Sequence, residues 1–370
     1  MGLAGFASKE STERYCRRFP DKMAASHFRQ TQGIWLSSIG LGTYLGNYDT
    51  ETDDLYRYAT IRAVQAGCNV IDTAINYRCQ RSERSVGAAL KQLAANGYLR
   101  DELVIATKGG FIPYDNAPPK DLKTYFTETF IQPGIAQPAD IVANCHCMTP
   151  KYLQNQLDCS LRNLEVETID VYYVHNPETQ LAKVTRDEFI QRLLEAFQSL
   201  EEAVSAGKIR FYGAATWNGL RNETTAKDYL ALAELVELAT RAGGKDHHFK
   251  FIQLPINLGM SEALSVTNQH VGAQQMTLLE AAQALGITVM CSASVLQGQL
   301  THDLPPMIHE AFPGLRTDGQ RALQFVRSTP GVTTALVGMK QIAHVDENMA
   351  TAQVAPASSE QYSKLFQTAS

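Results

Sequence analysis

Short apolar segments alternate with longer segments, in which apolar residues recur every three or four positions, along most of the 370-residue chain. The short segments are rich in β-branched and aromatic residues, as buried strands are, and the longer ones have the period of amphipathic helices. This alternation predicts parallel β/α units. Eight strands are expected, at residues 33–42, 68–72, 103–108, 168–175, 209–215, 251–254, 287–291 and 333–337.

The spacing of the strands predicts one α/β domain, a (β/α)8 TIM barrel. Strand ends recur every roughly 35 to 45 residues once residues 110–148 are set aside, which is close to one β/α unit of such a barrel. Two helices have clear boundaries. One starts after Thr149 with Pro150 in its first turn, and the other starts at a capping box of Thr277 and Glu280 and ends near Gly286.

Two regions fall outside the repeat. Residues 1–25 are expected to be a poorly ordered N-terminal extension of the barrel, which spans residues 26–370. The segment 110–148 is rich in proline and aromatic residues and follows the third strand, so it would lie at the C-terminal face of the barrel, where active sites are built. We expect it to be a loop that caps the active site, with a structural excursion or an oligomer contact as the alternatives.

Composition excludes several classes of protein. The chain has 33 basic and 38 acidic residues, a net charge of −5 and no basic run, so nucleic acid is not an expected partner. It lacks an apolar stretch of the ~18 residues that a membrane helix needs, and it lacks the apolar core of a signal peptide. A soluble, cytoplasmic protein that does not bind membranes is expected.

The seven cysteines show no paired CxxC spacing and are expected to be reduced thiols. Cys145-His146-Cys147 has the composition of a metal clip. However, neighbouring residues of an extended segment point to opposite sides, and no second pair of ligands is evident, so no metal site is predicted.

Several predicted strands end on a polar side chain. These residues are Asp72, Lys108, His175 and Gln253. In a barrel the strand ends form one ring around a shared mouth, so residues distant in sequence can converge there.

Tyr77 follows Asp72 by five positions, and together with Lys108 and His175 it suggests a chemistry. Hydride transfer to a carbonyl creates an alkoxide, which needs a proton donor. A tyrosine can donate if a nearby ammonium lowers its pKa of ~10. Lys108 would supply the charge, Asp72 would keep the lysine charged and oriented, and His175 would orient the carbonyl. Singly, these residues also fit a loop acid, a surface amine, a core histidine and a lid over apolar surface.

Two other nucleotide-binding patterns are rejected. Gly40, Gly42 and Gly46 have three residues between the second and third glycines, not the two of a dinucleotide fingerprint, and no amphipathic helix opens there. None of the fifteen tyrosines is followed four positions later by lysine, the pair that a short-chain reductase needs.

The chain resembles the aldo-keto reductase family from about residue 28 to residue 350. The resemblance is carried by "SSIGLGTYLG", "GCNVIDTAINYRCQRSERSVGAAL", "LVIATKGG", "IDVYYVHNPE" and "GVTTALVGMKQIAHVDEN". It implies a barrel with an N-terminal hairpin across its bottom, binding NADP(H) across the top without a Rossmann fold. It also implies that Tyr77 is the proton donor, that Lys108 and Asp72 activate it, and that His175 orients the carbonyl.

The resemblance also implies a set of cofactor-binding positions. In this sequence they are Thr43, Asp72, Thr216, Gln253, Ser292, Leu296, Gln297, Gly298, Gly338, Met339, Lys340, His344, Glu347 and Asn348.

The chain departs from the family pattern at five of the cofactor positions. Ala215-Thr216 replaces a Ser-Asn pair that grips the carboxamide, and Ser292 stands where a tyrosine often stacks on the nicotinamide, unless Trp217 replaces that stack. Gly338-Met339 replaces Lys-Ser, and His344 stands at a frequent arginine position. Recognition of a 2′-phosphate would therefore rest on Lys340, His344 or backbone N–H groups. NADP(H) is expected, and NAD(H) is left open.

The favoured function is an NADP(H)-dependent oxidoreductase acting on a small-molecule aldehyde or ketone. The alternative is a cofactor-binding regulatory or redox-sensing barrel with little turnover, and a third hypothesis is a barrel that binds a sugar phosphate. The sequence does not name the carbonyl compound or the direction of the reaction, and it leaves open a homo-oligomer.

Overall fold

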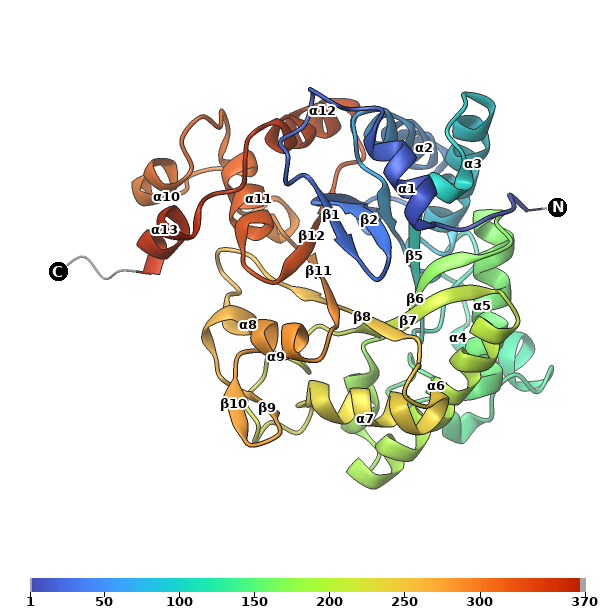
Figure 1. The fold of residues 1–370 in the computed structure, drawn as a ribbon. Coiled ribbons are helices and arrows are strands. Elements are labelled where there is room, and N and C mark those ends of the chain that lie inside the picture. The colour runs from blue at the N-terminus through green and yellow to red at the C-terminus, as the bar shows by residue number, and fades with distance from the viewer. Residues whose placement is uncertain (1, 367–370) are drawn as a thin grey trace.

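A closed barrel of eight parallel strands forms the centre of the computed structural model, which describes residues 2–366 (Figure 1). Around the barrel the order is β11-β12-β3-β4-β5-β6-β7-β8. The strands are β3 (Ile39–Gly42), β4 (Val70–Asp72), β5 (Val104–Gly109), β6 (Ile169–His175), β7 (Ile209–Ala215), β8 (Phe249–Pro255), β11 (Thr288–Ser292) and β12 (Val332–Gly338). Each predicted strand contributes one barrel strand, so the predicted (β/α)8 fold is confirmed.

The first predicted strand, 33–42, is wrong as a single element. It is divided into β2 (Ile34–Ser37) and β3, and β2 pairs antiparallel with β1 (Phe28–Thr31). The chain changes direction at Ser37-Ser38. There the backbone N–H of Ser37 donates to Asn69 Oδ1 (2.8 Å) and that of Ser38 to the His27 carbonyl (2.7 Å). The hairpin lies across the N-terminal end of the barrel (Figure 1), as the family resemblance implies.

Helices follow the strands around the barrel. The barrel helices are α2 (Thr50–Gln65), α3 (Arg81–Ala95), α5 (Pro150–Leu164), α6 (Arg186–Ser205), α7 (Leu232–Gly243), α9 (Leu278–Ala284), α11 (Asp318–Ser328) and α12 (Ile342–Ala350). The capping box of Thr277 and Glu280 is present at α9, and Gly286 has a left-handed φ of 67° just beyond it. Among the helices of residues 2–366, none combines the length and the apolar character that crossing a membrane requires.

Shorter elements fill the connections. They are α1 (Lys9–Cys16), α4 (Leu122–Phe126), α8 (Glu262–Ser265), α10 (Pro306–Ala311), α13 (Ser359–Ser363), the hairpin of β9 (Gln269–Val271) and β10 (Gln274–Met276), the 3-10 turns η1 (Arg100–Glu102), η3 (Pro138–Asp140), η4 (Pro177–Ala182), η5 (Leu296–Gly298), η6 (Thr351–Gln353) and η7 (Lys364–Phe366), and one π turn, η2 (Thr127–Ile131).

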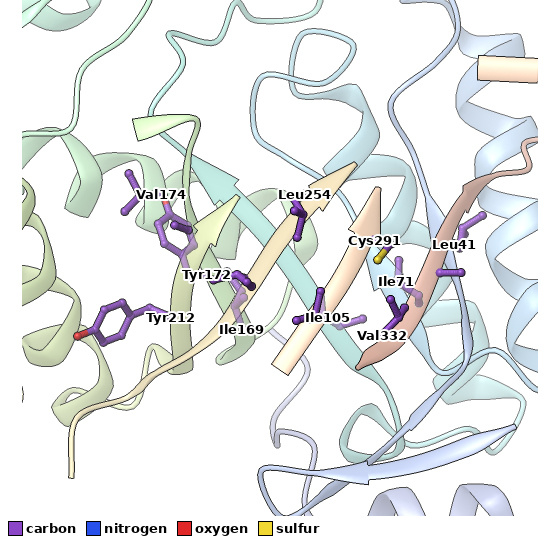
Figure 2. Packing of buried hydrophobic residues seen from close by; sticks show 14 of the residues in the cluster. Leu41, Ile71, Ile105, Ile169, Tyr172, Val174, Tyr212, Leu254, Cys291 and Val332 are labelled. Carbon is purple, nitrogen blue, oxygen red and sulfur yellow. The ribbon is translucent and has the colours of Figure 1, made fainter. Parts of the chain in front are cut away.

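Two apolar layers hold the barrel together, because successive side chains of a strand point to opposite faces. The interior contains residues such as Val70, Val171 and Met290. The outer layer lies between strands and helices, and Figure 2 shows labelled members of it on the barrel strands. There the Tyr212 ring of β7 packs on Phe197 of α6, with ring centroids 5.3 Å apart. These layers fix the strand ends that carry the polar residues.

The N-terminal residues pack on the barrel, which differs from the expectation of a poorly ordered extension. Helix α1 buries Tyr15 completely, and its hydroxyl donates to the Val64 carbonyl (2.6 Å). Arg14 forms ion pairs with Asp101 (2.8 Å) and Glu102 (3.0 Å). The partners of this helix lie roughly 50 to 90 positions further along the chain, and so a local pattern does not reveal them.

The segment 110–148 has a paired stem, in which residues 110–112 lie beside residues 145–147, and a folded tip between the two. In the stem Cys147 N donates to the Gly110 carbonyl (2.9 Å), and Ile112 N donates to the Cys145 carbonyl (2.7 Å). In the tip the Phe130 ring packs on Tyr152 of α5 (5.6 Å between centroids). The stem therefore lies at the end of β5, beside the mouth of the barrel. That the segment caps an active site stays a prediction.

Candidate active site

A buried ion pair lies at the mouth, which we define as the carboxyl-terminal end of the barrel strands. Lys108 Nζ of β5 donates to Asp72 Oδ1 of β4 (2.6 Å) and to the Thr73 carbonyl (2.7 Å). Gln253 of β8 donates from Nε2 to the other carboxylate oxygen of Asp72 (2.8 Å). The Lys108 side chain is only 1% exposed and that of Asp72 5%. Three strand ends that are far apart in sequence therefore meet, as the barrel predicts.

The Tyr77 ring lies directly against this pair. Lys108 Nζ is 4.9 Å from the ring centroid, and the His175 ring lies on another side with centroids 5.9 Å apart. An ammonium carries three N–H donors, and two of those on Lys108 are used by Asp72 and Thr73. Neither bond uses the third N–H donor, and the Tyr77 hydroxyl makes no hydrogen bond with any residue in the described part of the chain. The structure brings the four side chains together, and their catalytic roles stay a prediction.

The pKa of Tyr77 differs from the sequence-based expectation. Burial raises it well above 10, and the negative charge of Asp72 raises it further. The expected lowering by Lys108 is absent because Asp72 is in direct contact with the ammonium and balances its charge. In this state Tyr77 is a neutral phenol, so it carries a proton that it can donate.

The ion pair is subject to two opposing effects. Burial lowers the pKa of Lys108 and raises that of Asp72, while the attraction between the two groups favours their charged forms. We regard the pair as ionised because each charge also has a neutral hydrogen-bond partner, the Thr73 carbonyl for Lys108 and the Gln253 amide for Asp72.

His175, the last residue of β6, is a neutral imidazole. Burial lowers its pKa well below the ordinary value, and the positive charge of Lys108 lowers it further. Within residues 2–366, its Nδ1 is buried without a hydrogen-bond partner. Because a buried N–H without an acceptor is rare and costly, we assign the ring proton to Nε2. The ring can then donate a hydrogen bond to a carbonyl oxygen.

The predicted nicotinamide contacts also lie at strand ends. Thr43 follows β3, Thr216 follows β7, and Ser292 ends β11. Thr43 Oγ1 donates to the Asp72 carbonyl (3.2 Å), and Thr216 N donates to the Gln253 carbonyl (2.8 Å). Thr216 Oγ1 is buried and has no partner among the described residues.

The remaining predicted cofactor residues lie after the last two barrel strands. Leu296, Gln297 and Gly298 form η5 after β11, all with positive φ angles of 45°, 54° and 93°. The others, Gly338, Met339, Lys340, His344, Glu347 and Asn348, run from the end of β12 into α12.

Not all of the side chains near α12 are free to bind a ligand. Met339 is fully buried, and Asn348 Nδ2 faces its sulfur at 3.7 Å. Glu347 Oε1 accepts from Thr317 Oγ1 (2.5 Å). His344 is exposed, and Lys340 Nζ lies 3.5 Å from the position that a Cβ on Gly46 would take. The two predicted phosphate ligands thus differ in surroundings, with His344 at the surface and Lys340 beside the loop after β3.

Two buried side chains near the mouth were given no functional role from the sequence. Glu178 Oε1 accepts from the backbone N–H groups of Trp217 (2.8 Å), Asn218 (3.1 Å) and Gly219 (3.2 Å), and so it holds the loop that begins at Thr216. His146 contacts the backbone of His175. Both lie in segments that the sequence singled out, "HNPE" and Cys145-His146-Cys147, but no local pattern reveals their partners.

The possible metal clip has no support from the structure. Nowhere in residues 2–366 do three or more His, Cys, Asp or Glu side chains gather as metal ligands would. Cys147 is buried, whereas Cys145 is partly exposed.

Comparison with known proteins shows which proteins the chain is similar to. Residues 38–306 match the model of the aldo/keto reductase family. The chain is 29% identical over 210 residues to the NADH-specific methylglyoxal reductase of Escherichia coli strain K12, a match that covers only 55% of each chain. It is 23% identical over 338 residues to L-galactose dehydrogenase of Arabidopsis thaliana, covering 86% of this chain and 85% of that protein.

Among solved structures, the fold is similar to that of an aldo/keto reductase from Klebsiella pneumoniae in complex with NADP and acetate. The TM-score is 0.62 and the identity 21%, over 92% of this chain and 94% of that one. At this level of identity the similarity concerns the fold.

Proposed function

Because the chain belongs to the aldo/keto reductase family, we propose that it transfers a hydride between NADP(H) and the carbonyl carbon of an aldehyde or ketone. The observation that supports this most is the contact of Tyr77 with both Lys108 (4.9 Å) and His175 (5.9 Å) at the mouth of the barrel. A proton donor, a positive charge and a neutral hydrogen-bond donor together are what a developing alkoxide requires.

Each of the four site residues has a separate role toward the carbonyl oxygen of the substrate. His175 donates a hydrogen bond from Nε2 and so orients the oxygen before reaction. Tyr77 then gives its hydroxyl proton to the oxygen, a favourable transfer because an alkoxide is a much stronger base than a phenolate. The third N–H of Lys108 stabilises the phenolate that remains, and Asp72 keeps the ammonium in place. In the oxidative direction the same groups act in reverse.

The mouth offers polar groups that fit a nicotinamide carboxamide. The buried hydroxyl of Thr216 has no partner among residues 2–366, and Gln253 uses its amide N–H on Asp72 while its Oε1 is left to accept. A carboxamide can donate to Gln253 Oε1 and hydrogen-bond to the Thr216 hydroxyl. When bound, the reduced nicotinamide supplies the hydride. The left-handed turn Leu296–Gly298 is the proposed pyrophosphate loop, since strained backbone often marks a ligand-binding segment.

We propose NADP(H) rather than NAD(H) because Lys340 and His344 are available to a 2′-phosphate. Relatives differ on this point: the Escherichia coli protein is named as NADH-specific, whereas the Klebsiella pneumoniae structure contains NADP. The preference therefore depends on these two residues of the chain itself, together with backbone N–H groups near the start of α12.

The test is reduction of a panel of aldehydes and ketones with NADPH and with NADH, for the parent protein and Tyr77→Phe. We expect steady turnover by the parent. The variant should lose kcat by about a hundredfold while the Kd for NADPH, followed by Trp217 fluorescence, stays within about twofold. Tyr58→Phe is the matched control, since Tyr58 is an exposed phenol on α2. Tight dinucleotide binding without turnover of any carbonyl would instead support the regulatory barrel, and parental kcat in Tyr77→Phe would refute the role of Tyr77.

A further inference from the structure

His146 lies on the stem of segment 110–148, where it is fixed by the backbone. The backbone of His146 pairs with that of Phe111 in an isolated antiparallel bridge, and hydrogen bonds flank the bridge on both sides. The side chain is completely buried. Because Phe111 is only two residues beyond β5, the stem holds this imidazole next to the mouth of the barrel.

The two ring nitrogens of His146 have different partners. Nε2 lies 2.7 Å from the carbonyl oxygen of His175, which can only accept, so Nε2 carries the proton. Nδ1 lies 2.8 Å from the Gln180 amide nitrogen and accepts from it. The orientation of that amide is set in turn by Arg192, which donates to Gln180 Oε1 (2.7 Å). Burial lowers the pKa of His146 to about 4, so the ring is neutral near neutral pH and in one defined tautomer.

The same stem also touches the His175 ring. The Phe111 ring lies edge-on to His175, with centroids 5.0 Å apart, and edge-on to His146 at 5.3 Å. Position 110 has no room for a side chain, because a Cβ on Gly110 would lie 2.8 Å from His146 Nε2 and 3.0 Å from the His175 carbonyl oxygen. His175 is thus held at its peptide by His146 and at its ring by Phe111.

We propose that His146 is a positioning residue for His175. By donating to the carbonyl of the last residue of β6, it fixes the direction in which the His175 imidazole presents its Nε2–H to a substrate oxygen. Segment 110–148 would then act on the reaction through its stem, whatever its tip does. This inference rests on the proposed function for its effect on rate, but the contact itself can be tested without turnover.

The kinetic test compares His146→Leu with His146→Gln. Leucine removes the donor, and we expect kcat/KM for the carbonyl to fall by about ten- to a hundredfold, as for a small displacement of a positioning group. Glutamine places an amide N–H near the position of Nε2 and should retain most of the activity. The Kd for NADPH should stay unchanged in both variants. A general structural defect would lower cofactor binding and melting temperature as well.

A double-mutant cycle with His175→Ala shows whether His146 acts through His175. If it does, His146→Leu costs nothing further once His175 is absent, and the two losses are not additive. Additive losses would overturn the proposal. Should His146→Leu fail to fold, His146→Asn replaces it, since its shorter amide falls short of the His175 carbonyl. The proposal then requires His146→Asn to be at least tenfold less active than His146→Gln.

A measurement on 15N-labelled histidine separates this inference from the proposed function. The imidazole signals of His175 should shift or broaden in His146→Leu and stay at their parental positions in Cys145→Ser, a substitution at the neighbouring, partly exposed residue. This result is expected whether or not the protein reduces carbonyls, so absence of turnover alone would refute only the function. Unchanged His175 signals in His146→Leu would overturn the positioning role.

Discussion

Replacing Lys108 with methionine removes the positive charge that contacts the Tyr77 ring while keeping most of the side-chain volume. The ammonium lies 4.9 Å from the ring centroid, in a buried site. At this distance and an effective dielectric constant of about 20, the attraction between a full phenolate charge and the ammonium is ~3 kcal/mol. If most of that charge has formed in the transition state, kcat should fall by about a hundredfold.

The negative charge of Asp72, the other member of the ion pair, allows the direction of a further change in kcat to be predicted. In Lys108→Met the Asp72 carboxylate is left buried without its cation, and its negative charge opposes phenolate formation, as its effect on the pKa of Tyr77 shows. Removing this charge in Lys108→Met/Asp72→Asn should therefore raise kcat above that of the single variant. It should also recover stability, because an unpaired buried charge costs about 3 to 5 kcal/mol.

The assay is aldehyde reduction at saturating NADPH, with the Kd for NADPH measured separately and stability measured by urea unfolding. Lys183→Met is the matched control, since this lysine is exposed near the end of η4. Loss of kcat with intact cofactor binding is expected of Lys108→Met and not of the control Lys183→Met. A parental kcat in that variant, or a double variant slower than the single one, would refute the electrostatic role of the pair.

Three further results are expected. His344→Ala should raise KM for NADPH by several-fold more than KM for NADH, and equal effects would remove this residue from 2′-phosphate recognition. Glu178→Gln should weaken dinucleotide binding about tenfold in a fluorescence titration, because neutral acceptors form weaker hydrogen bonds to the Trp217, Asn218 and Gly219 amides than a carboxylate does; unchanged binding would contradict this. Burial lowers the pKa of His27 from 6.5 to about 4, so as the pH falls this imidazole takes up a proton in the unfolded chain before it does so in the folded protein. The stability that the neutral His27 contributes is therefore fully present above pH 6.5 and is lost as the pH falls toward 4. This group should contribute about 2 kcal/mol of that loss by pH 5, and urea unfolding of His27→Gln at pH 7 and 5 should show a correspondingly smaller pH dependence.

The convergence of the site was predictable because barrel geometry does not depend on side-chain detail. Asp72, Lys108 and His175 each follow an apolar run, and once the runs are recognised as strands of one barrel their ends must meet. The electrostatic balance was not predictable. The pKa of Tyr77 is raised chiefly by burial and further by the charge of Asp72, which lies 2.6 Å from the ammonium that was expected to lower it.

Local patterns also failed where a residue has its partners elsewhere in the chain. The pattern Cys145-His146-Cys147 suggests only a possible metal clip, because the His175 carbonyl and the Gln180 amide are roughly 30 positions away and have no sequence signal. The break between β2 and β3 has no local signal for a similar reason, since Asn69, which supports the turn, belongs to the next β/α unit.

The sequence by itself determined the period of strand and helix, the closure of eight units into one barrel and the types of polar residue at the strand ends. These properties follow from local apolar spacing, which each segment carries on its own. Tertiary structure decided which titratable groups are protonated and in which direction each imidazole points. Those properties depend on burial and on contacts of a few ångströms between residues distant in the chain, and such distances exist only after the barrel has closed.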